Sequence, residues 1–318
     1  MNNSSDSLRR FLFEHAPIRG ELVRLDATWQ SVIERHDYPP VLRDLMGELC
    51  AATVLLAATL KLHGSMVLQI HGKGPVKLLV VECTGDLELR ATAKWEGELS
   101  GGTLQDLVGD GRFVITLDPK DGNQAYQGIV ALEGESIAEI LQNYMTRSEQ
   151  LETRLWLAAD GKHAAGMLLQ KLPENGELPD DDPWDRAVLI GNTLKPDELL
   201  NVPVTELLHL LYHEDDVRLF DAQPVVFRCT CSRENVARML RMLGREEVNA
   251  IIDERGDVEV HCEFCNQRYV FDRVDADAVF ADIMALAANK TLHYPNSSLA
   301  TAPARSNRPT QPSLPCHL

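Results

Sequence analysis

The chain has 318 residues, of which 44% are hydrophobic and 25% charged, and its formal net charge is −17 at pH 7. The length exceeds what one compact core usually holds, so two domains of a soluble globular protein are expected. A charge this negative repels phosphate backbones, and no run of Lys and Arg offsets it, which argues against nucleic acid as a partner. No stretch reaches the roughly 18 apolar residues of a membrane span, and the N-terminus lacks the apolar core of a secretory signal. We therefore expect a cytoplasmic protein without a membrane partner.

The first half of the chain predicts a mixed sheet-and-helix domain, so the expected fold class is α+β. Alternating or continuous apolar runs predict strands at 20–26, 65–72, 76–83, 87–95, 113–119, 126–134, 153–159 and 164–172. Short glycine-containing turns between the second, third and fourth of these strands indicate an antiparallel meander. Helices are expected at 40–61, where apolar residues recur every three or four positions, and at 136–150, which Ser136 opens as the capping residue.

Composition changes after Pro173, where PENGELPDDDPWD is rich in Pro, Gly and acidic residues and indicates a boundary. Helical segments follow, such as VTELLHLLYHED (204–215). The sequence predicts no large sheet for these segments to pack against, so we expect them to be only marginally stable. The predicted organisation is an N-terminal domain over 1–174 and a metastable helical linker over 175–228.

The C-terminal region predicts a small domain over 229–287. Its expected elements are helices at 232–243 and 246–253, a hairpin of 258–262 with 268–271, and a last helix at 275–288. Pro, Ser, Thr and Ala dominate the rest of the chain, so 288–318 is expected to be a disordered tail.

The cysteines of this small domain occur in two close pairs. Cys229 and Cys231 form a C-x-C pair, and Cys262 and Cys265 form a C-x-x-C pair. Together they supply the tetrahedral Cys₄ shell that zinc favours, and the plain interpretation is a structural zinc site. Two thiols this close can also form a disulfide, or bind metal and form a disulfide in turn. His261 is interpreted as a neighbour of the site, because four thiolates already complete the shell.

Three further features favour a reactive site over a purely structural one. The C-x-C spacing is unusual for structural zinc modules, which mostly use C-x₂₋₄-C pairs. Arg228, Arg233 and Arg268 lie beside the cysteines in the sequence and would favour thiolates, the form that reacts with oxidants. The linker before the site is expected to be poorly anchored, so the structural effect of losing a metal would extend into it.

The remaining cysteines are interpreted differently. Cys50 lies in an apolar helix and Cys83 at a strand end, and both are expected to be buried and inert. Cys316 lies in the Pro-rich tail and is not assigned to the site. No metalloprotease, nucleophile-elbow or phosphate-loop motif is present; His213 and Glu214 lack the second histidine of H-E-x-x-H.

Several segments together resemble one known family. FRCTCSREN (227–235) followed by HCEFCNQRYVF (261–271) resembles the C-terminal signature of the redox-regulated 33-kDa chaperonin family, bacterial heat-shock protein 33. The similarity extends over roughly residues 7 to 287. The other matching segments are RGELVRL (19–25), YQGIVALEG (126–134), YMTRSEQL (144–151), GMLLQ (166–170) and LLYHED (210–215).

The resemblance implies a cytoplasmic, ATP-independent holdase that is not an enzyme and that prevents aggregation under oxidative and heat stress. When the protein is reduced, Cys229, Cys231, Cys262 and Cys265 are implied to bind one zinc ion per chain, and the chaperone is off. Oxidants are implied to form the disulfides Cys229–Cys231 and Cys262–Cys265. Zinc then leaves, the small domain and linker unfold, and a homodimer binds unfolding clients, which pass later to ATP-dependent chaperones.

Two other function classes remain in view. A thiol–disulfide oxidoreductase would use Cys262 and Cys265 catalytically, but it would need a thioredoxin-like βαβ setting, whereas this pair lies between two predicted strands. A zinc-ribbon regulator would bind nucleic acid or a protein, and the net charge argues against nucleic acid.

Overall fold

The computed structural model of the chain describes residues 6–60, 63–99, 101–119, 124–173 and 183–290. The chain divides into two compact units, Met1–Ser232 with Val260–Tyr269, and Arg233–Glu259 with Val270–Leu318. Within the described ranges, no helix is long and apolar enough to cross a membrane. All four paired cysteines fall in the first unit, which also contains both large sheets.

One of these sheets, sheet B, contains the predicted meander. Its strand order is β12-β5-β4-β3-β6-β7. The strands β3, β4 and β5 pair antiparallel in sequence, as the turns between them predict, and β6 pairs antiparallel with both β3 and β7. Only β12 is parallel to its neighbour, β5. The strand bounds are β3 (Gly64–His71), β4 (Val76–Thr84), β5 (Glu88–Trp95), β6 (Arg112–Pro119), β7 (Tyr126–Val130) and β12 (Val226–Phe227).

The other sheet, sheet A, has the order β10-β1-β2-β9-β8, and β11 also pairs with β1. The predicted pair at 153–159 and 164–172 is confirmed as β8 and β9, which are antiparallel. A Cβ at Gly20 would overlap the ring of Phe11, so the glycine makes room on β2 for this buried ring of β1. The strand bounds are β1 (Ser7–Phe13), β2 (Ile18–Leu25), β8 (Thr153–Ala159), β9 (Ala164–Lys171), β10 (Val217–Leu219) and β11 (Gln223–Pro224).

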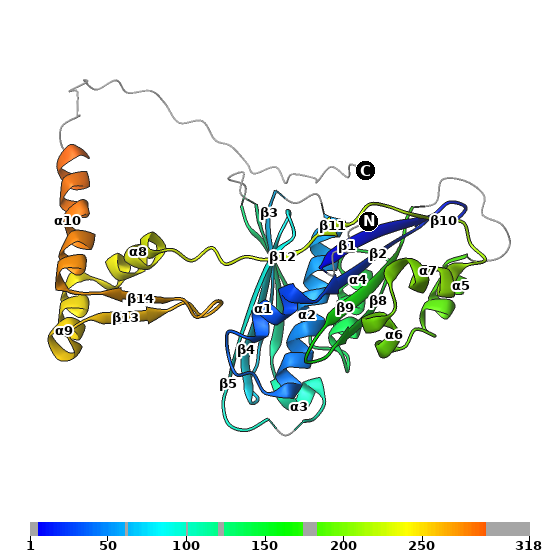
Figure 1. Cartoon of the computed structure of the whole chain (residues 1–318), viewed down its shortest axis with the longest axis horizontal. Coiled ribbons are helices and arrows are strands. Elements are labelled where there is room, and N and C mark those ends of the chain that lie inside the picture. Colours follow the sequence, from blue (N-terminus) through cyan, green and yellow to red (C-terminus); the bar gives the residue numbers. More distant parts are fainter. Residues whose placement is uncertain (1–5, 61–62, 100, 120–123, 174–182, 291–318) are drawn as a thin grey trace, which may run out of the picture. The chain divides into compact units, whose positions relative to one another are not determined.

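The main core forms around α2 (Pro40–Thr59), which contacts strands of both sheets (Figure 1). Its side chains are buried on nearly every face, from Leu42 to Ala58, as expected for a helix that is apolar all round. Shorter helices complete this side of the unit: α1 (Ala27–Ile33), α3 (Leu104–Val108) and α4 (Ile137–Arg147). The side chain of Ser136 accepts a hydrogen bond from the Glu139 amide, so the predicted cap of α4 is confirmed.

The linker helices correct one expectation from the sequence. The helices are α5 (Pro183–Gly191), α6 (Pro196–Asn201) and α7 (Val204–Tyr212). They do lean on a large sheet: Trp184, Leu207 and Tyr212 pack in one apolar cluster with Phe11 and Met167 of sheet A. The prediction that these helices lack a sheet to lean against was therefore wrong. It failed because β1 was not predicted, and β1 supplies much of the face that they cover.

The chain after α7 returns to the sheets as short strands, which the sequence did not predict. Residues Val217–Phe227, here called the edge segment, contribute β10 and β11 to the edge of β1, and β12 to the edge of β5. Most of its side chains are exposed or half-buried, and Val225 is the buried exception. One short segment thus closes an edge of both sheets directly before Cys229.

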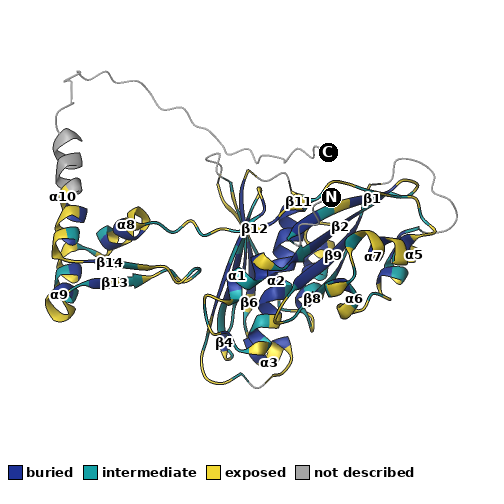
Figure 2. Cartoon of the chain, in the orientation of Figure 1, coloured by how far each residue is buried: buried dark blue, intermediate teal, exposed yellow. Residues whose placement is uncertain are grey.

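The second unit contains α8 (Arg233–Leu243), α9 (Arg245–Arg255) and α10 (Arg273–Lys290). These helices confirm the three that the sequence predicts beyond residue 231. The β13 (Val258–His261) and β14 (Arg268–Phe271) strands confirm the predicted hairpin. Few side chains are buried here, among them Leu240, Val248 and Phe271 (Figure 2). The expected tail beyond residue 290, with Cys316, and most of the 173–185 boundary lie outside the described residues.

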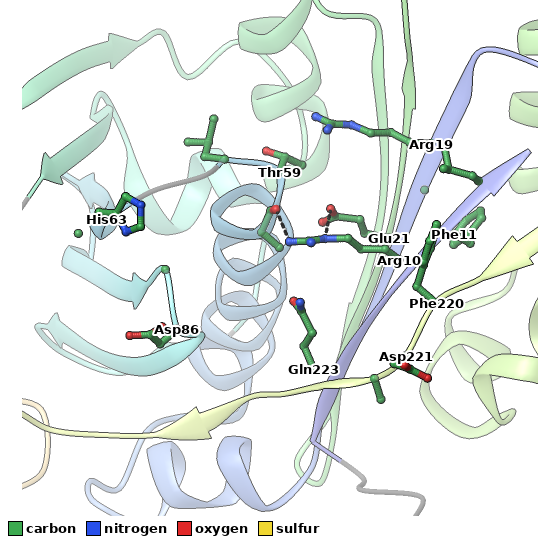
Figure 3. A pocket seen from close by; sticks show the side chains of 17 residues that line it. Arg10, Phe11, Arg19, Glu21, Thr59, His63, Asp86, Phe220, Asp221 and Gln223 are labelled. Atoms are coloured by element: carbon green, nitrogen blue, oxygen red, sulfur yellow. Dashed lines mark hydrogen bonds and ion pairs between the residues drawn. The ribbon is translucent and has the colours of Figure 1, made fainter. Parts of the chain in front are cut away.

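A cavity of about 1010 Å³ lies in the first unit, lined by the end of α2, by β1 and β2, and by Phe220–Gln223. Figure 3 shows Arg10 reaching across it: its guanidinium lies 3.4 Å from Glu21 and donates to the Ala58 carbonyl at 2.7 Å. The Glu21 side chain is only 2% exposed, and its Oε2 atom has no hydrogen-bond partner among the described residues. Burial raises the pKa of Glu21 to about 7, although Arg10 and Arg19 act in the opposite direction.

The raised pKa of Glu21 predicts a pH-dependent stability. Because the folded-state pKa lies above the unfolded value, the contribution of this group to stability is largest when it is protonated and is lost as pH rises from about 4.5 through 7. Glu21→Gln should therefore gain stability relative to the parent as pH rises from about 5 to 8, by up to about 3 kcal/mol. Denaturant unfolding of the reduced protein across this range measures the difference. The exposed Glu34→Gln is the control, and a difference that does not change with pH would contradict the prediction.

Candidate metal centre

The four paired cysteines converge on one point in the first unit. Their sulfur atoms all lie within 4.8 Å of one another, and each side chain is half-buried. The closest approaches run between the pairs: Cys229 Sγ lies 3.6 Å from Cys262 Sγ, and Cys231 Sγ lies 3.3 Å from Cys265 Sγ. A tetrahedral zinc ion with Zn–S bonds of about 2.3 Å would hold its sulfurs about 3.8 Å apart. The arrangement therefore fits one metal ion shared by two segments.

The C-x-x-C pair is positioned by the turn of the β13–β14 hairpin. The Cys262 amide donates to the Gln267 carbonyl at 3.0 Å, and the Asn266 amide donates to the Cys262 carbonyl at 2.8 Å. Asn266 adopts a positive φ of 56°, which asparagine tolerates better than most residues. These bonds fold the backbone tightly enough to bring the sulfurs of Cys262 and Cys265 to the same side of the turn.

The C-x-C pair is positioned by β12 and β5. The Arg228 amide donates to the Leu89 carbonyl at 3.0 Å, which extends the parallel pairing of β12 up to the first cysteine. The Arg228 side chain pairs with Glu88 at 2.5 Å. Cys229 and Cys231 therefore start from a fixed point on the edge of sheet B.

The hairpin turn is attached to β5 through Glu263. The Glu263 carbonyl accepts a hydrogen bond from the Thr92 hydroxyl at 2.8 Å and lies 2.8 Å from Nε2 of His36. The Glu263 carboxylate forms an ion pair with Lys94. Both cysteine pairs are thus held against β5, although they are far apart in sequence.

Arg90 of β5 connects the two cysteine segments, and the sequence analysis did not identify it. Its guanidinium donates to Thr230 Oγ1 at 2.8 Å and stacks 4.3 Å from the ring centroid of Phe264. Glu82 accepts a hydrogen bond from its Nε at 2.8 Å. Burial lowers the pKa of Arg90, but the hydrogen bond and charge of Glu82, with a smaller part from Cys229, raise it overall. Arg90 is therefore a fixed positive charge beside the sulfurs.

Two of the three cations predicted from the sequence, Arg228 and Arg233, are paired with carboxylates. Arg228 pairs with Glu88, and Arg233 pairs with Asp275 at 2.8 Å. The arginines next to the cysteines in the sequence were the natural candidates for positive charges beside the thiols. Arg228 and Arg233 instead form ion pairs with nearby carboxylates. No sequence signal identifies Arg90, because its contact with Thr230 joins residues 140 positions apart.

The thiols themselves favour a bound cation. Burial, with the hydrogen bonds of the neighbouring cysteines, raises the pKa of Cys265 and so favours its uncharged thiol. A divalent ion at the centre of the four sulfurs would reverse this preference and hold them as thiolates. Tyr269 supports the same charge: its hydroxyl donates to Cys231 Sγ at 3.2 Å, and this bond raises the pKa of Tyr269 to about 12.

Histidine is not part of this group of ligand atoms. Among the described residues, the cluster that can hold a metal consists of the four cysteines. The His261 side chain is exposed, and its Nδ1 lies 3.1 Å from Oδ1 of Asn266. His261 therefore lies beside the site, as the sequence interpretation expects.

Cys50 and Cys83 are both fully buried in the core around α2, which confirms their predicted location. Burial raises the pKa of both thiols, that of Cys83 to about 12. Both therefore remain protonated near neutral pH and have little reactivity toward oxidants.

Comparison with known proteins identifies the family. A family model described as Hsp33 protein matches residues 6–272. The chain belongs to the Hsp33 family. A 33 kDa chaperonin of Methylobacillus flagellatus is 55% identical over 290 residues, which are 91% of this chain and 99% of the relative. A 33 kDa chaperonin of Chromobacterium violaceum is 53% identical and covers 92% of this chain and 99% of the relative. The chain is thus an Hsp33-type chaperonin.

A solved structure supports the fold. The crystal structure of the 33 kDa chaperonin (heat shock protein 33 homolog) from Thermotoga maritima aligns with a TM-score of 0.75. It covers 88% of this chain and 99% of its own, at 21% identity. The α+β fold predicted from the sequence is the fold of the Hsp33 family.

Removal of the Arg90 guanidinium should weaken metal binding. We expect Arg90→Gln to lower affinity by about 10–100-fold, because it removes a contact to both cysteine segments. Titration of the reduced, metal-free chain with Co²⁺, read from the absorption of tetrahedral cobalt thiolate, measures this. Thr230→Ala removes one of these contacts without unpairing Glu82, and should show a smaller loss.

The exposed Arg112→Gln, also on sheet B, is the matched control and should bind Co²⁺ as the parent does. An Arg90→Gln chain with parental affinity and an unchanged melting temperature would show that Arg90 has no role in holding the metal.

Proposed function

We propose that this chaperonin is a redox-regulated, ATP-independent holdase that is off when reduced and bound to zinc. The proposal rests on the sulfur contacts between the two cysteine pairs: Cys229 lies against Cys262, and Cys231 lies against Cys265. One zinc ion per chain, bound by these four sulfurs, cross-links two segments that are far apart in the sequence. Zinc ligation contributes on the order of 10 kcal/mol to folding a small metallo-domain.

Oxidation removes the cross-link if disulfides form within each pair, Cys229–Cys231 and Cys262–Cys265. Each disulfide forms as two thiolates lose two electrons to one peroxide molecule, which takes up two protons and is reduced to two waters. The four sulfurs then no longer serve as thiolate ligands, so the ion is released. Neither disulfide joins the two segments, so nothing replaces the connection between them.

The consequence is unfolding of the part of the chain that depends on the cross-link. We propose three functional parts: a stable core over 1–174, a metastable linker over 175–228, and a zinc-binding switch over 229–287. The linker covers apolar side chains of sheet A, among them Phe11, Phe13 and Met167. Its release exposes this face to unfolding clients. Exposed apolar surface on a chain of net charge −17 stays dispersed through charge repulsion.

The remaining parts of the proposal follow the family. The active form is a homodimer in the cytoplasm that binds unfolding proteins, without nucleic acid or membrane as partner, and passes them to ATP-dependent chaperones after reduction. Enzymatic thiol–disulfide exchange is disfavoured by the setting of Cys262 and Cys265. They lie in a hairpin turn between β13 and β14 and not in the βαβ setting of a thioredoxin-like C-x-x-C pair.

Oxidation should couple zinc release to chaperone activity. We expect the reduced chain to contain one zinc ion and to leave heat-induced aggregation of a reporter protein unchanged. After peroxide treatment with heating, zinc should be released, and light scattering of the reporter should fall severalfold. A chromogenic chelator measures the zinc, and a thiol reagent counts the cysteines in the same samples.

Cys316→Ser is the control for oxidation outside the site and should switch as the parent does. Equal protection of the reporter by reduced and oxidised samples would defeat the proposed switch. Catalytic reduction of insulin by the reduced chain would favour the oxidoreductase class instead.

The disulfide connectivity is a separate prediction. In the closed site the closest sulfurs are Cys229 with Cys262, and Cys231 with Cys265. Cys229 and Cys262 are 33 positions apart, so once the site opens, that pair must close a long loop, whereas residues within each pair stay adjacent. Peptide mapping of the oxidised chain without reduction should therefore show Cys229–Cys231 and Cys262–Cys265. Cross-pair disulfides would keep the segments joined and would contradict the proposed release.

A further inference from the structure

The edge segment (Val217–Phe227) covers β1 only weakly. β10 pairs with β1 over Phe11–Phe13, and β11 pairs with it over Ser7 and Leu8. Between the two, the Phe220 amide donates to the Arg10 carbonyl at 2.9 Å. The side chains of β10 are half-buried or exposed and those of β11 are exposed. Pairings this short are not stable on their own.

β1 itself is firmly held on its other side. It pairs antiparallel with β2 from Ser7↔Arg24 to Leu12↔Arg19. Leu8 of β1 is also buried in the core around α2, a cluster that contains no residue of the linker helices α5–α7. Loss of the edge segment would therefore leave β1 in place as an open strand with unpaired backbone groups.

The hydrogen bonds to the edge segment show which amides and carbonyls of β1 would become unpaired. The Glu14 amide donates to the Asp216 carbonyl at 2.9 Å, and the Arg10 carbonyl accepts from Phe220. Because backbone groups alternate along a strand, Leu12 also directs its amide and carbonyl toward this edge. The open edge of β1 thus offers donors and acceptors at alternate residues from Arg10 to Glu14.

We propose that this edge of β1, once the edge segment has left it, accepts an extended segment of an unfolding client as an added antiparallel strand. The inference rests on the proposed function, because the edge segment lies in the linker that oxidation releases. The chain's own β10 and β11 show that β1 accepts strands in this orientation. Every unfolded polypeptide offers the same backbone amides and carbonyls for hydrogen bonding, so this edge binds clients without regard to their sequence.

The terminal strands at the other ends of the two sheets do not fit this role. In the described part of the chain, β7 and β8 end the two sheets and carry no further strand. Their outer edges are the same before and after oxidation, so they cannot account for a gain of binding. The edges of β1 and β5 differ because their covers lie in the segment that is released. The cover of β1 extends from Ser7 to Phe13, whereas β12 covers β5 only at Glu88 and Leu89, so β1 gains the longer open edge.

The cavity beside β1 gives the added strand room. Phe220–Gln223 line it opposite Arg10 and Glu21 (Figure 3), and within this stretch Asp221 and Ala222 belong to neither strand that pairs with β1. A client strand paired continuously along β1 would pass through this space and place alternate side chains next to Arg10. Apolar residues at the intervening positions would face the surface that the linker helices cover in the reduced state.

The test uses the full-length oxidised, zinc-free chain and a short fluorescent peptide of alternating valine and threonine, as long as β1. We expect the Leu12 and Glu14 amides to lose hydrogen-exchange protection on oxidation and to regain at least tenfold protection when the peptide binds. The reduced chain should not bind the peptide. A matched peptide with two adjacent N-methylated residues at its centre keeps every side chain but loses donors on both of its edges. Its affinity should fall at least tenfold.

Equal affinity of the two peptides, absence of peptide binding, or unchanged exchange at Leu12 and Glu14 with peptide bound would overturn the edge proposal. Concentration-dependent protection of these amides without peptide would assign the edge to a second copy of the chain and would also overturn it. Suppression of aggregation is measured on the same samples. The proposed switch fails only if oxidation brings no suppression, so the two failures are distinguishable.

Discussion

Four sulfur atoms within 4.8 Å of one another form the constraint that holds the cysteine segments together, and with them the edge segment that leads to Cys229. Thiolates at this distance repel one another unless a cation lies between them. The closest sulfur contacts join Cys229 to Cys262 and Cys231 to Cys265, so a shared ion is also a cross-link between two segments. Arg90, Thr92 and Lys94 fix that cross-link to β5 through the hairpin turn and Thr230. The site is therefore part of sheet B and not an appendage of it.

The edge segment connects this site to the client-binding surface in the proposed cycle. It begins on β1, ends on β5, and leads directly to Cys229. A backbone hydrogen bond contributes about 1 kcal/mol net, whereas fixing one residue's backbone costs about 1–2 kcal/mol. Ladders of two or three residues therefore cannot hold the segment unless its ends are anchored. The cysteine cluster anchors the end after Phe227, and α7 packed on sheet A anchors the end before Val217.

Much of this fold can be predicted from local sequence. The strands of the meander, the helix α2 and the β13–β14 hairpin follow from apolar periodicity and glycine turns, and the four cysteines of the candidate metal centre follow from the two cysteine pairs. β1 was missed because SLRRFLF interrupts its alternation with Arg9 and Arg10, which lie between the residues that pair with β10 and β11. β10, β11 and β12 are too short for a periodic signal, and their pairing depends on strands far away in sequence. Arg90 was missed for the same reason, since only the folded sheet brings it to Thr230.

The same short pairings explain why the switch can be reversible in the proposed cycle. The core around α2 contains the long strands and most of the large buried side chains, and none of the four paired cysteines belongs to it. The parts that depend on them are the two-residue and three-residue strands of the edge segment, which have few buried side chains. Loss of the cross-link thus opens sheet edges and one apolar face without disturbing the sheets themselves. Because β1 and β5 stay in place as templates, the edge segment can pair with them again when the thiols are reduced.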